Sequence, residues 1–193
     1  ISTNFFKDKG VVKNQDFTRY TFRVNLDHKI NDKVRIGTST LGVYGLRNGE
    51  NFNPLGGALA ENPLGKPYDD EGNLIFLPTQ DGLRTNPLAE IVPGAIIDER
   101  KNYRIFNSLY AEVDIIEGLK YRFNFGPDFE MDRYGRFFGS QTNNRRGAPA
   151  SGAVYNKFHF NYTVENILTY SKQFNSIHNL NVTLLQSYQK DNL

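Results

Sequence analysis

Apolar and polar residues alternate strictly along several long segments of this 193-residue chain, most clearly at 17–28 and 119–132. Successive side chains of a β-strand point to opposite faces, so each segment predicts a strand with one apolar and one polar face. In 119–132 the apolar set is Leu119, Tyr121, Phe123, Phe125, Phe129 and Met131, and the polar set is Lys120, Arg122, Asn124, Asp128, Glu130 and Asp132. At about 3.3 Å per residue, such a strand exceeds the usual length in globular domains, which is roughly 3 to 10 residues.

The same period recurs at 103–115, 158–170 and 180–188, and more weakly at 34–44. Short connections, expected at 30–33, 116–119 and 171–178, alternate with long ones at 46–101 and 133–157. Long connections argue against a compact soluble domain, whereas outer-membrane barrels combine short periplasmic turns with long extracellular loops. The sequence therefore predicts an all-β fold, an antiparallel up-and-down transmembrane β-barrel segment of about six strands that starts in an external loop. The alternative is a soluble β-sandwich, in which the same apolar stripes face a dry core.

Composition excludes several other classes of protein. No apolar run approaches the roughly 18 residues of a membrane-spanning helix. The net charge is only +2 and the basic residues are dispersed, so nucleic acid is not an expected partner. The chain has no cysteine and three scattered histidines, His28, His159 and His178, without a recognisable metal or nucleophile motif. We therefore expect no cofactor and no metal site.

Three carboxylates at two-residue spacing form the most conspicuous charged group. Asp128, Glu130 and Asp132 would lie on one strand face about 7 Å apart, near the separation of the two carboxyl groups in inverting glycosidases. A barrel interior in which they pair with basic residues on adjacent strands is the favoured interpretation, and contact with a substrate or a bound cation remains open. With Arg122 on the same face, they are the candidate ligand-binding residues of the strands.

Aromatic and acidic residues also occur in the segment 46–101. Tyr68 is a candidate ligand-binding residue there because sugars stack on aromatic rings, although packing among loop aromatics is the alternative. The acidic run at 69–73, DDEGN, has oxygen ligands but lacks the spacing of a calcium loop. We expect it to form an ordinary Asp/Gly turn.

Two motifs near the N-terminus carry a family resemblance. The stretch FFKDKGVVKNQDFTRY at 5–20, followed by RVNLDHKI at 23–30, resembles the early barrel region of SusC/RagA-type TonB-dependent transporters of Bacteroidetes. In that family, an element of the form G-I/V-V/I-K-x-x-D-F-x-R-Y leads into R-x-N-L-D-H. The segments NPLGKPY at 62–68 and DEGN at 70–73 resemble the external loop that follows.

The resemblance implies that 1–193 is part of one barrel domain, with a plug domain and further strands outside it and both ends cut from a longer protein. It further implies that 46–101 is an extracellular loop and that the protein lies in the bacterial outer membrane, in contact with lipid. The implied activity is import of oligosaccharides or peptides, powered through TonB and assisted by a SusD-like surface lipoprotein, with no enzymatic step. The rival hypothesis is a soluble all-β glycan-binding module or glycan hydrolase.

Overall fold

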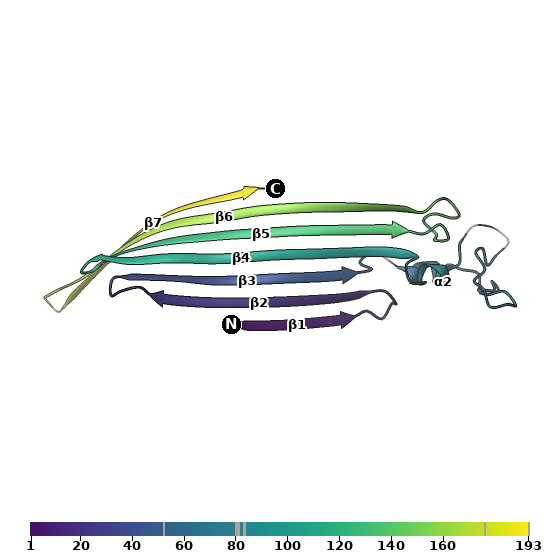
Figure 1. Cartoon of the computed structure of the whole chain (residues 1–193), viewed down its shortest axis with the longest axis horizontal. Coiled ribbons are helices and arrows are strands. Elements are labelled where there is room, and N and C mark those ends of the chain that lie inside the picture. The colour runs from purple at the N-terminus through teal and green to yellow at the C-terminus, as the bar shows by residue number, and fades with distance from the viewer. Residues whose placement is uncertain (52, 80–81, 83, 176, 193) are drawn as a thin grey trace.

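The computed structural model describes residues 1–51, 53–79, 82, 84–175 and 177–192. Seven strands form one antiparallel sheet in which each strand pairs with its neighbours in sequence (Figure 1). The strands are β1 (Ser2–Lys9), β2 (Asp16–Lys29), β3 (Val34–Asn48), β4 (Ile96–Ile116), β5 (Leu119–Phe138), β6 (Ser151–Phe174) and β7 (His178–Asn192), with short helices α1 (Pro54–Leu59) and α2 (Pro87–Glu90) between β3 and β4. This architecture confirms the predicted all-β, up-and-down fold.

One strand more than the expected number is present. The segment Ser2–Lys9 was expected in an external loop, but it forms β1, which pairs with β2 from Ser2 opposite Arg23 to Lys9 opposite Asp16. A tight turn at 10–15 joins the two strands. In this turn the Gly10 amide donates to the Gln15 carbonyl at 2.8 Å, and Asn14 adopts a left-handed φ of 67°. The local turn makes pairing possible for a segment whose alternation is too short to read by itself.

The strands also extend further than the sequence predicts. The connection expected at 46–101 spans 49–95, because the end of β3 pairs with the start of β4, Leu46 opposite Lys101 and Asn48 opposite Glu99. The connection expected at 133–157 likewise shrinks to 139–150. With 21 residues in β4 and 24 in β6, these strands are roughly 70 to 80 Å long, more than twice the roughly 30 Å of a bilayer's hydrocarbon core.

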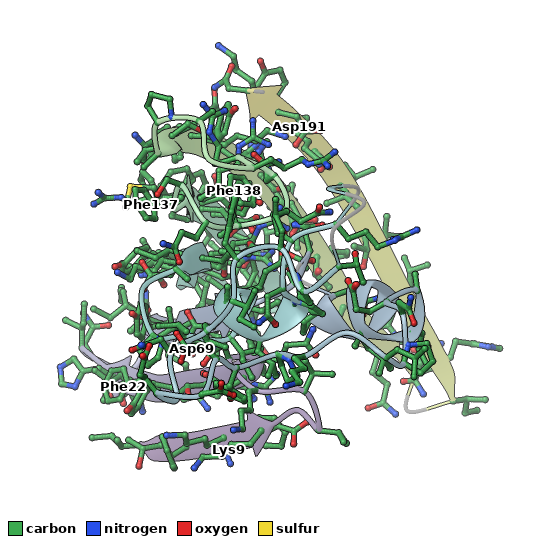
Figure 2. All side chains as sticks on the ribbon, turned by 90° about the vertical axis from the view of Figure 1, so that its right-hand side faces the viewer. Lys9, Phe22, Asp69, Phe137, Phe138 and Asp191 are labelled. Carbon is green, nitrogen blue, oxygen red and sulfur yellow. The ribbon has the colours of Figure 1, made fainter. Side chains whose placement is uncertain are left out.

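The connections segregate to the two ends of the sheet. The turns after β2, β4 and β6 lie at one end, whereas both long connections lie at the other (Figure 1). Asn31 closes the first short turn by accepting from the amides of Lys33 and Val34, and Gly118 closes the second with a φ of 79°. Viewed from the end that carries the long connections, β7 is rotated strongly against β1, so the sheet is twisted (Figure 2).

The pairing register keeps the two faces of the sheet chemically distinct. One face, the apolar face, carries side chains such as Phe22 and Leu184, which are 46% and 63% exposed. The opposite face, the polar face, carries most of the charged and amide groups. Among the described residues, the buried apolar side chains are small ones, namely Pro54, Ala89 and Pro127. No helix in the described part of the chain is long and apolar enough to cross a membrane.

A single row of large side chains crosses the apolar face, and we call it the aromatic row. Its members lie directly opposite one another on successive strands, namely Phe5, Tyr20, Tyr44, Tyr103, Met131 and Phe158 on β1 to β6. Ring centroids are 5.0 Å apart for Phe5 and Tyr20 and 4.9 Å apart for Tyr44 and Tyr103. Aromatic pairs at these separations are mutually attractive, so the row ties the strands together across their side chains.

The connection 49–95 folds around a buried asparagine. The Asn86 side chain donates to the carbonyls of Pro67 and Ile75 at 2.8 and 3.0 Å and accepts from the Leu88 amide at 3.0 Å. The last bond caps α2 at its N-terminus. The connection also contacts the segment 139–150, because Glu90 accepts from the Asn143 amide at 3.1 Å. These bonds give the long connections a defined local structure.

Candidate functional site on the polar face

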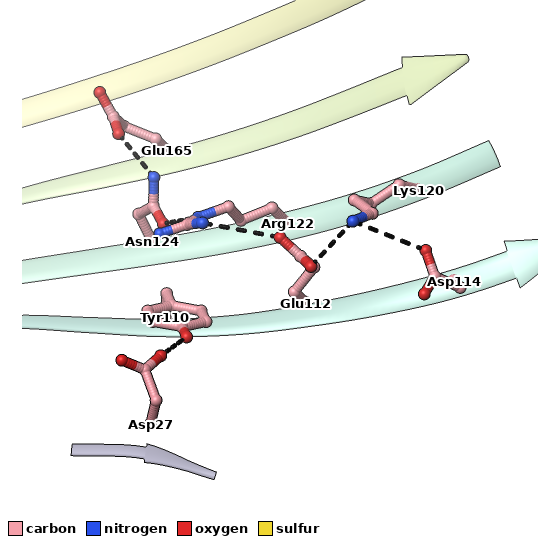
Figure 3. A network of polar contacts seen from close by, with 8 residues as sticks. All are labelled: Asp27, Tyr110, Glu112, Asp114, Lys120, Arg122, Asn124 and Glu165. Carbon is pink, nitrogen blue, oxygen red and sulfur yellow. Dashed lines mark hydrogen bonds and ion pairs between the residues drawn. The ribbon is translucent and has the colours of Figure 1, made fainter. Parts of the chain in front are cut away.

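A network of charged and amide groups lies on the polar face near the end with the short turns (Figure 3). We call it the polar network, and its members are Asp27, Tyr110, Glu112, Asp114, Lys120, Arg122, Asn124 and Glu165. They come from β2, β4, β5 and β6, so residues far apart in sequence meet through strand pairing. The alternation of the strands directs them all to one side.

Arg122 lies at the centre of the polar network. Its Nε donates to Oδ1 of Asn124 at 2.9 Å, and its Nη1 is 3.6 Å from a carboxylate oxygen of Glu112. The guanidinium carbon lies 4.2 Å from the centre of the Tyr110 ring, which is a cation–π contact. Asn124 links Arg122 to β6, because its Nδ2 donates a hydrogen bond to the Glu165 carboxylate at 2.9 Å. Arg122 is therefore held in a fixed orientation by groups on β4 and on its own strand, and it is linked to β6 through Asn124.

Tyr110 reaches its partner by lying across a glycine. Gly37 is directly opposite Tyr110 on β3, and Asp27 is directly opposite Gly37 on β2. A Cβ atom built at Gly37 would clash with the Tyr110 ring, so only glycine leaves space for the ring in this position. The Tyr110 hydroxyl donates to the Asp27 carboxylate across the intervening strand.

The three carboxylates predicted on β5 lie together on the polar face, nearer the end with the long connections. Asp128 accepts two hydrogen bonds from Arg104 on β4, at 2.9 Å from Nε and 2.6 Å from Nη2. Glu130 and Asp132 share the amide of Asn102, whose Nδ2 is 2.9 Å from each. The expected pairing with a basic residue on an adjacent strand is thus confirmed for Asp128.

This arrangement disfavours general acid–base catalysis by the carboxylates. A general acid needs a raised carboxyl pKa, which arises in an apolar and poorly solvated pocket. Asp128 instead accepts two charge-assisted bonds from a guanidinium that is itself about half exposed, so its surroundings are neither apolar nor closed to solvent. Within the described residues, no group of three or more His, Cys, Asp or Glu side chains could hold a metal ion. The polar face offers fixed donors and acceptors, which suit the binding of polar molecules.

Tyr68 lies apart from the other candidate residues, in the connection 49–95. Its backbone pairs with Leu74 in an isolated antiparallel bridge, and its side chain is 48% exposed. The acidic run beside it forms a turn in which Asp69 accepts from the Asn73 amide at 2.7 Å and from the Glu71 amide at 3.1 Å. These hydrogen bonds lower the pKa of the Asp69 carboxyl below its usual value, and the bond from the Asn73 amide has the largest effect. Asp128, Glu130 and Asp132 therefore lie together, Arg122 lies on the same face nearer the short turns, and Tyr68 lies outside the sheet.

Sequence reasoning did not select Arg104, Asn102 and Tyr110 as site residues. Their parity on β4 already places them on the polar face. Their partners, however, depend on the register between β4 and its two neighbours, and alternation along one strand carries no information about register. The register becomes known only from the strand pairs of the folded sheet.

Comparison with protein-family models finds no match. Two sequence relatives come from Formosa agariphila, TonB-dependent receptor P3 at 29% identity and TonB-dependent receptor P26 at 27% identity. Both alignments cover 98% of this chain, but they cover 20% and 19% of the relatives. The chain therefore spans about a fifth of the length of the relatives it matches.

Solved structures agree in fold. The RagAB peptide transporter superposes with a TM-score of 0.72 over 96% of this chain and 22% of that chain, at 18% sequence identity. The RagAB peptide importer in its open-open state gives a TM-score of 0.67 over 92% of this chain and 20% of that chain, at 19% identity. The resemblance to SusC/RagA-type TonB-dependent transporters is confirmed. The seven strands correspond in fold to part of such a transporter's barrel.

Proposed function

We propose that this chain forms part of the wall of a SusC/RagA-type transporter that imports nutrients, either oligosaccharides or peptides, across the bacterial outer membrane. The observation that carries the proposal is the two-faced meander, with an exposed apolar face and a polar face that is internally hydrogen-bonded. An apolar face of this size needs a non-aqueous neighbour, and outer-membrane lipid provides one. The polar face then lines the transport lumen.

The long connections supply the external face of the proposed transporter. Leu55, Leu59 and Leu64 are exposed in the connection 49–95. Leu55 also lines a hollow of about 370 Å³, together with Leu88. Exposed apolar side chains on an otherwise hydrogen-bonded loop favour a protein partner. A SusD-like surface lipoprotein is the partner we propose for this face, and coupling to TonB would run through parts of the protein outside these strands.

Ligand contacts are proposed for both regions. Arg122, Asp128, Glu130 and Asp132 would contact substrate from the wall, and Tyr68, which is about half exposed, would contact it from the loop. Neighbouring polar residues such as Arg104 and Asn102 would contribute to the same substrate contacts. Individual substitutions in the wall should therefore matter less than removal of the loop.

An uptake assay on the complete protein tests this proposal. Deleting 53–79 should abolish most uptake of the nutrient whose import depends on the protein, because it removes α1, Tyr68 and the exposed leucines while leaving strand pairing intact. Asp128→Asn and Glu130→Gln should leave uptake nearly unchanged at equal surface abundance.

The glycan-hydrolase alternative makes the opposite prediction. If the two carboxylates were an acid–base pair, each amide substitution would lower activity by about 100-fold or more. Strong loss from either single substitution, or cleavage of a glycan by the purified protein, would refute the transporter proposal for these residues.

A further inference from the structure

A row of basic side chains lies directly beyond the aromatic row, on the same apolar face. Lys7, Lys101 and Arg133 each lie two residues from a member of the aromatic row on their own strand, on the side toward the end with the long connections. The complete row, from β1 to β6, is Lys7, Thr18, Leu46, Lys101, Arg133 and Asn156. The border of the apolar face is therefore positively charged on three of these six strands.

Two of these cations are direct neighbours. Lys101 and Arg133 lie directly opposite each other on β4 and β5, which places their Cβ atoms about 5 Å apart. Like charges in this position destabilise a strand pair unless an anion lies close by. Glu99 provides one for Lys101, with the ammonium nitrogen 2.7 Å from the carboxylate oxygen. In the described part of the chain, no hydrogen bond or ion pair is made by the exposed Arg133 side chain, so a net positive charge remains.

The surroundings of this pair have the chemistry of a membrane border. Tyr103, Met131 and Phe158 lie one row below, exposed on the apolar face, and form a surface for acyl chains. Asn156 lies directly opposite Arg133 on β6, exposed and with amide hydrogens available as donors. Arginine and lysine side chains at the end of an apolar surface extend their charged groups toward the headgroup layer while their stems lie against the apolar surface.

We propose that Lys101, Arg133 and Asn156 bind the phosphate group of an anionic lipid in the outer leaflet, with its acyl chains against Tyr103, Met131 and Phe158. Arginine and lysine are well suited to phosphate oxygens, and the phosphate supplies the negative charge that Arg133 lacks. The proposal rests on the proposed function, because it requires the apolar face to lie in a membrane. It adds a lipid-binding site on the outer wall, away from the transport lumen.

Native mass spectrometry of the complete detergent-purified protein tests the site, with diphosphorylated lipid A and a phosphatidylcholine as probes. The wild-type protein should retain lipid A in preference to phosphatidylcholine. Arg133→Gln should weaken lipid A binding about fivefold, and the Lys101→Gln, Arg133→Gln double variant about twentyfold, because each basic residue near an anionic surface contributes a similar amount. Phosphatidylcholine binding should not change in either variant.

Arg136→Gln is the matched control, since it makes the same charge change on the same strand but on the polar face, where Arg136 donates to Tyr155. Lipid A binding should be unchanged in this variant. Equal binding in the wild-type protein and the double variant, or equal weakening by Arg136→Gln and Arg133→Gln, would overturn the site. Displacement of lipid A by an equal concentration of inorganic phosphate would overturn its assignment to a lipid.

The outcome can be separated from that of the proposed function. Arg133 faces away from the lumen, so Arg133→Gln should leave nutrient uptake unchanged. A protein that sediments with the outer membrane but shows no preference for lipid A would refute the lipid site alone. A protein recovered entirely in the aqueous fraction would refute both proposals.

Discussion

The sheet and the connection 49–95 differ in which side chains they bury and which they leave exposed. In the sheet, large apolar side chains such as Leu184 remain exposed, and stability comes from backbone ladders and cross-strand contacts. In the connection, the most buried side chain is polar, with Asn86 only 1% exposed and fully engaged in hydrogen bonds. The contrast shows that the two regions are built for different surroundings.

An exposed apolar face is unfavourable in water, by about 25 cal/mol for each Å² of apolar surface. The same face is favourable in lipid, where no side chain needs to be buried against protein. The connection shows the complementary solution, because a loop in water must satisfy its own buried backbone groups and Asn86 does so for two carbonyls and one amide. The comparison thus supports the proposed arrangement of a membrane wall with a folded cap.

The largest expected effect concerns the apolar face. Leu109 lies on the apolar face, six residues along β4 from Tyr103 of the aromatic row toward the short turns, and is already 39% exposed, so Leu109→Arg should cost little in water. In a bilayer it should destabilise the complete barrel by about 2 to 4 kcal/mol, because a charge near the midplane must be desolvated. Ser108→Arg, on the opposite face of the same strand, is the control and should cost far less. Reversible unfolding of the complete barrel in lipid vesicles measures both, and equal losses would remove the distinction between the two faces.

An intermediate effect is expected in the connection. Asn86→Ala leaves the carbonyls of Pro67 and Ile75 and the amide of Leu88 without their partner, which should destabilise the local fold by about 2 kcal/mol. Hydrogen exchange at amides within 49–95 should accelerate, while exchange in β4 and β5 stays unchanged.

Asn62→Ala is the matched control for this variant, since Asn62 is exposed and its side chain accepts one hydrogen bond, from the Leu64 amide. It should leave exchange nearly as it is. Faster exchange throughout the sheet in Asn86→Ala would show that the connection and the sheet unfold as one unit. That result would contradict the contrast between the two regions.

The smallest effect is expected where the polar face depends on a glycine. Gly37→Ala would place a methyl group against the Tyr110 ring and displace it from Asp27, at a cost of about 1 to 2 kcal/mol. Gly135→Ala is the control, because a Cβ at Gly135 meets no atom within 4 Å. Thermal unfolding of the complete barrel should separate the two variants. Equal stability of the two variants would mean that the contact between Tyr110 and Asp27 does not contribute to the stability of the wall.

Much of the fold was predictable because a β-strand has a period of two residues. The long alternating segments at 17–28 and 119–132 identified β2 and β5 and assigned their faces. Strand ends were less predictable, because residues such as Arg133 and Leu46 gain their strand conformation from a partner distant in sequence. The candidate site was predictable to the same extent, since Arg122, Asp128, Glu130 and Asp132 were placed on one face but their partners were not identified.

Alternation along the chain by itself determined which side chains share a face, because that property is set within each strand. Tertiary structure decided which of them meet. Arg104 lies directly opposite Glu130, yet its guanidinium bonds to Asp128, one position further along that face, and Asn102 serves both Glu130 and Asp132. Such choices depend on strand register and on side-chain reach across two strands, and the buried position of Asn86 depends on contacts between segments of a long connection. These are relations between segments, so no local pattern in the sequence contains them.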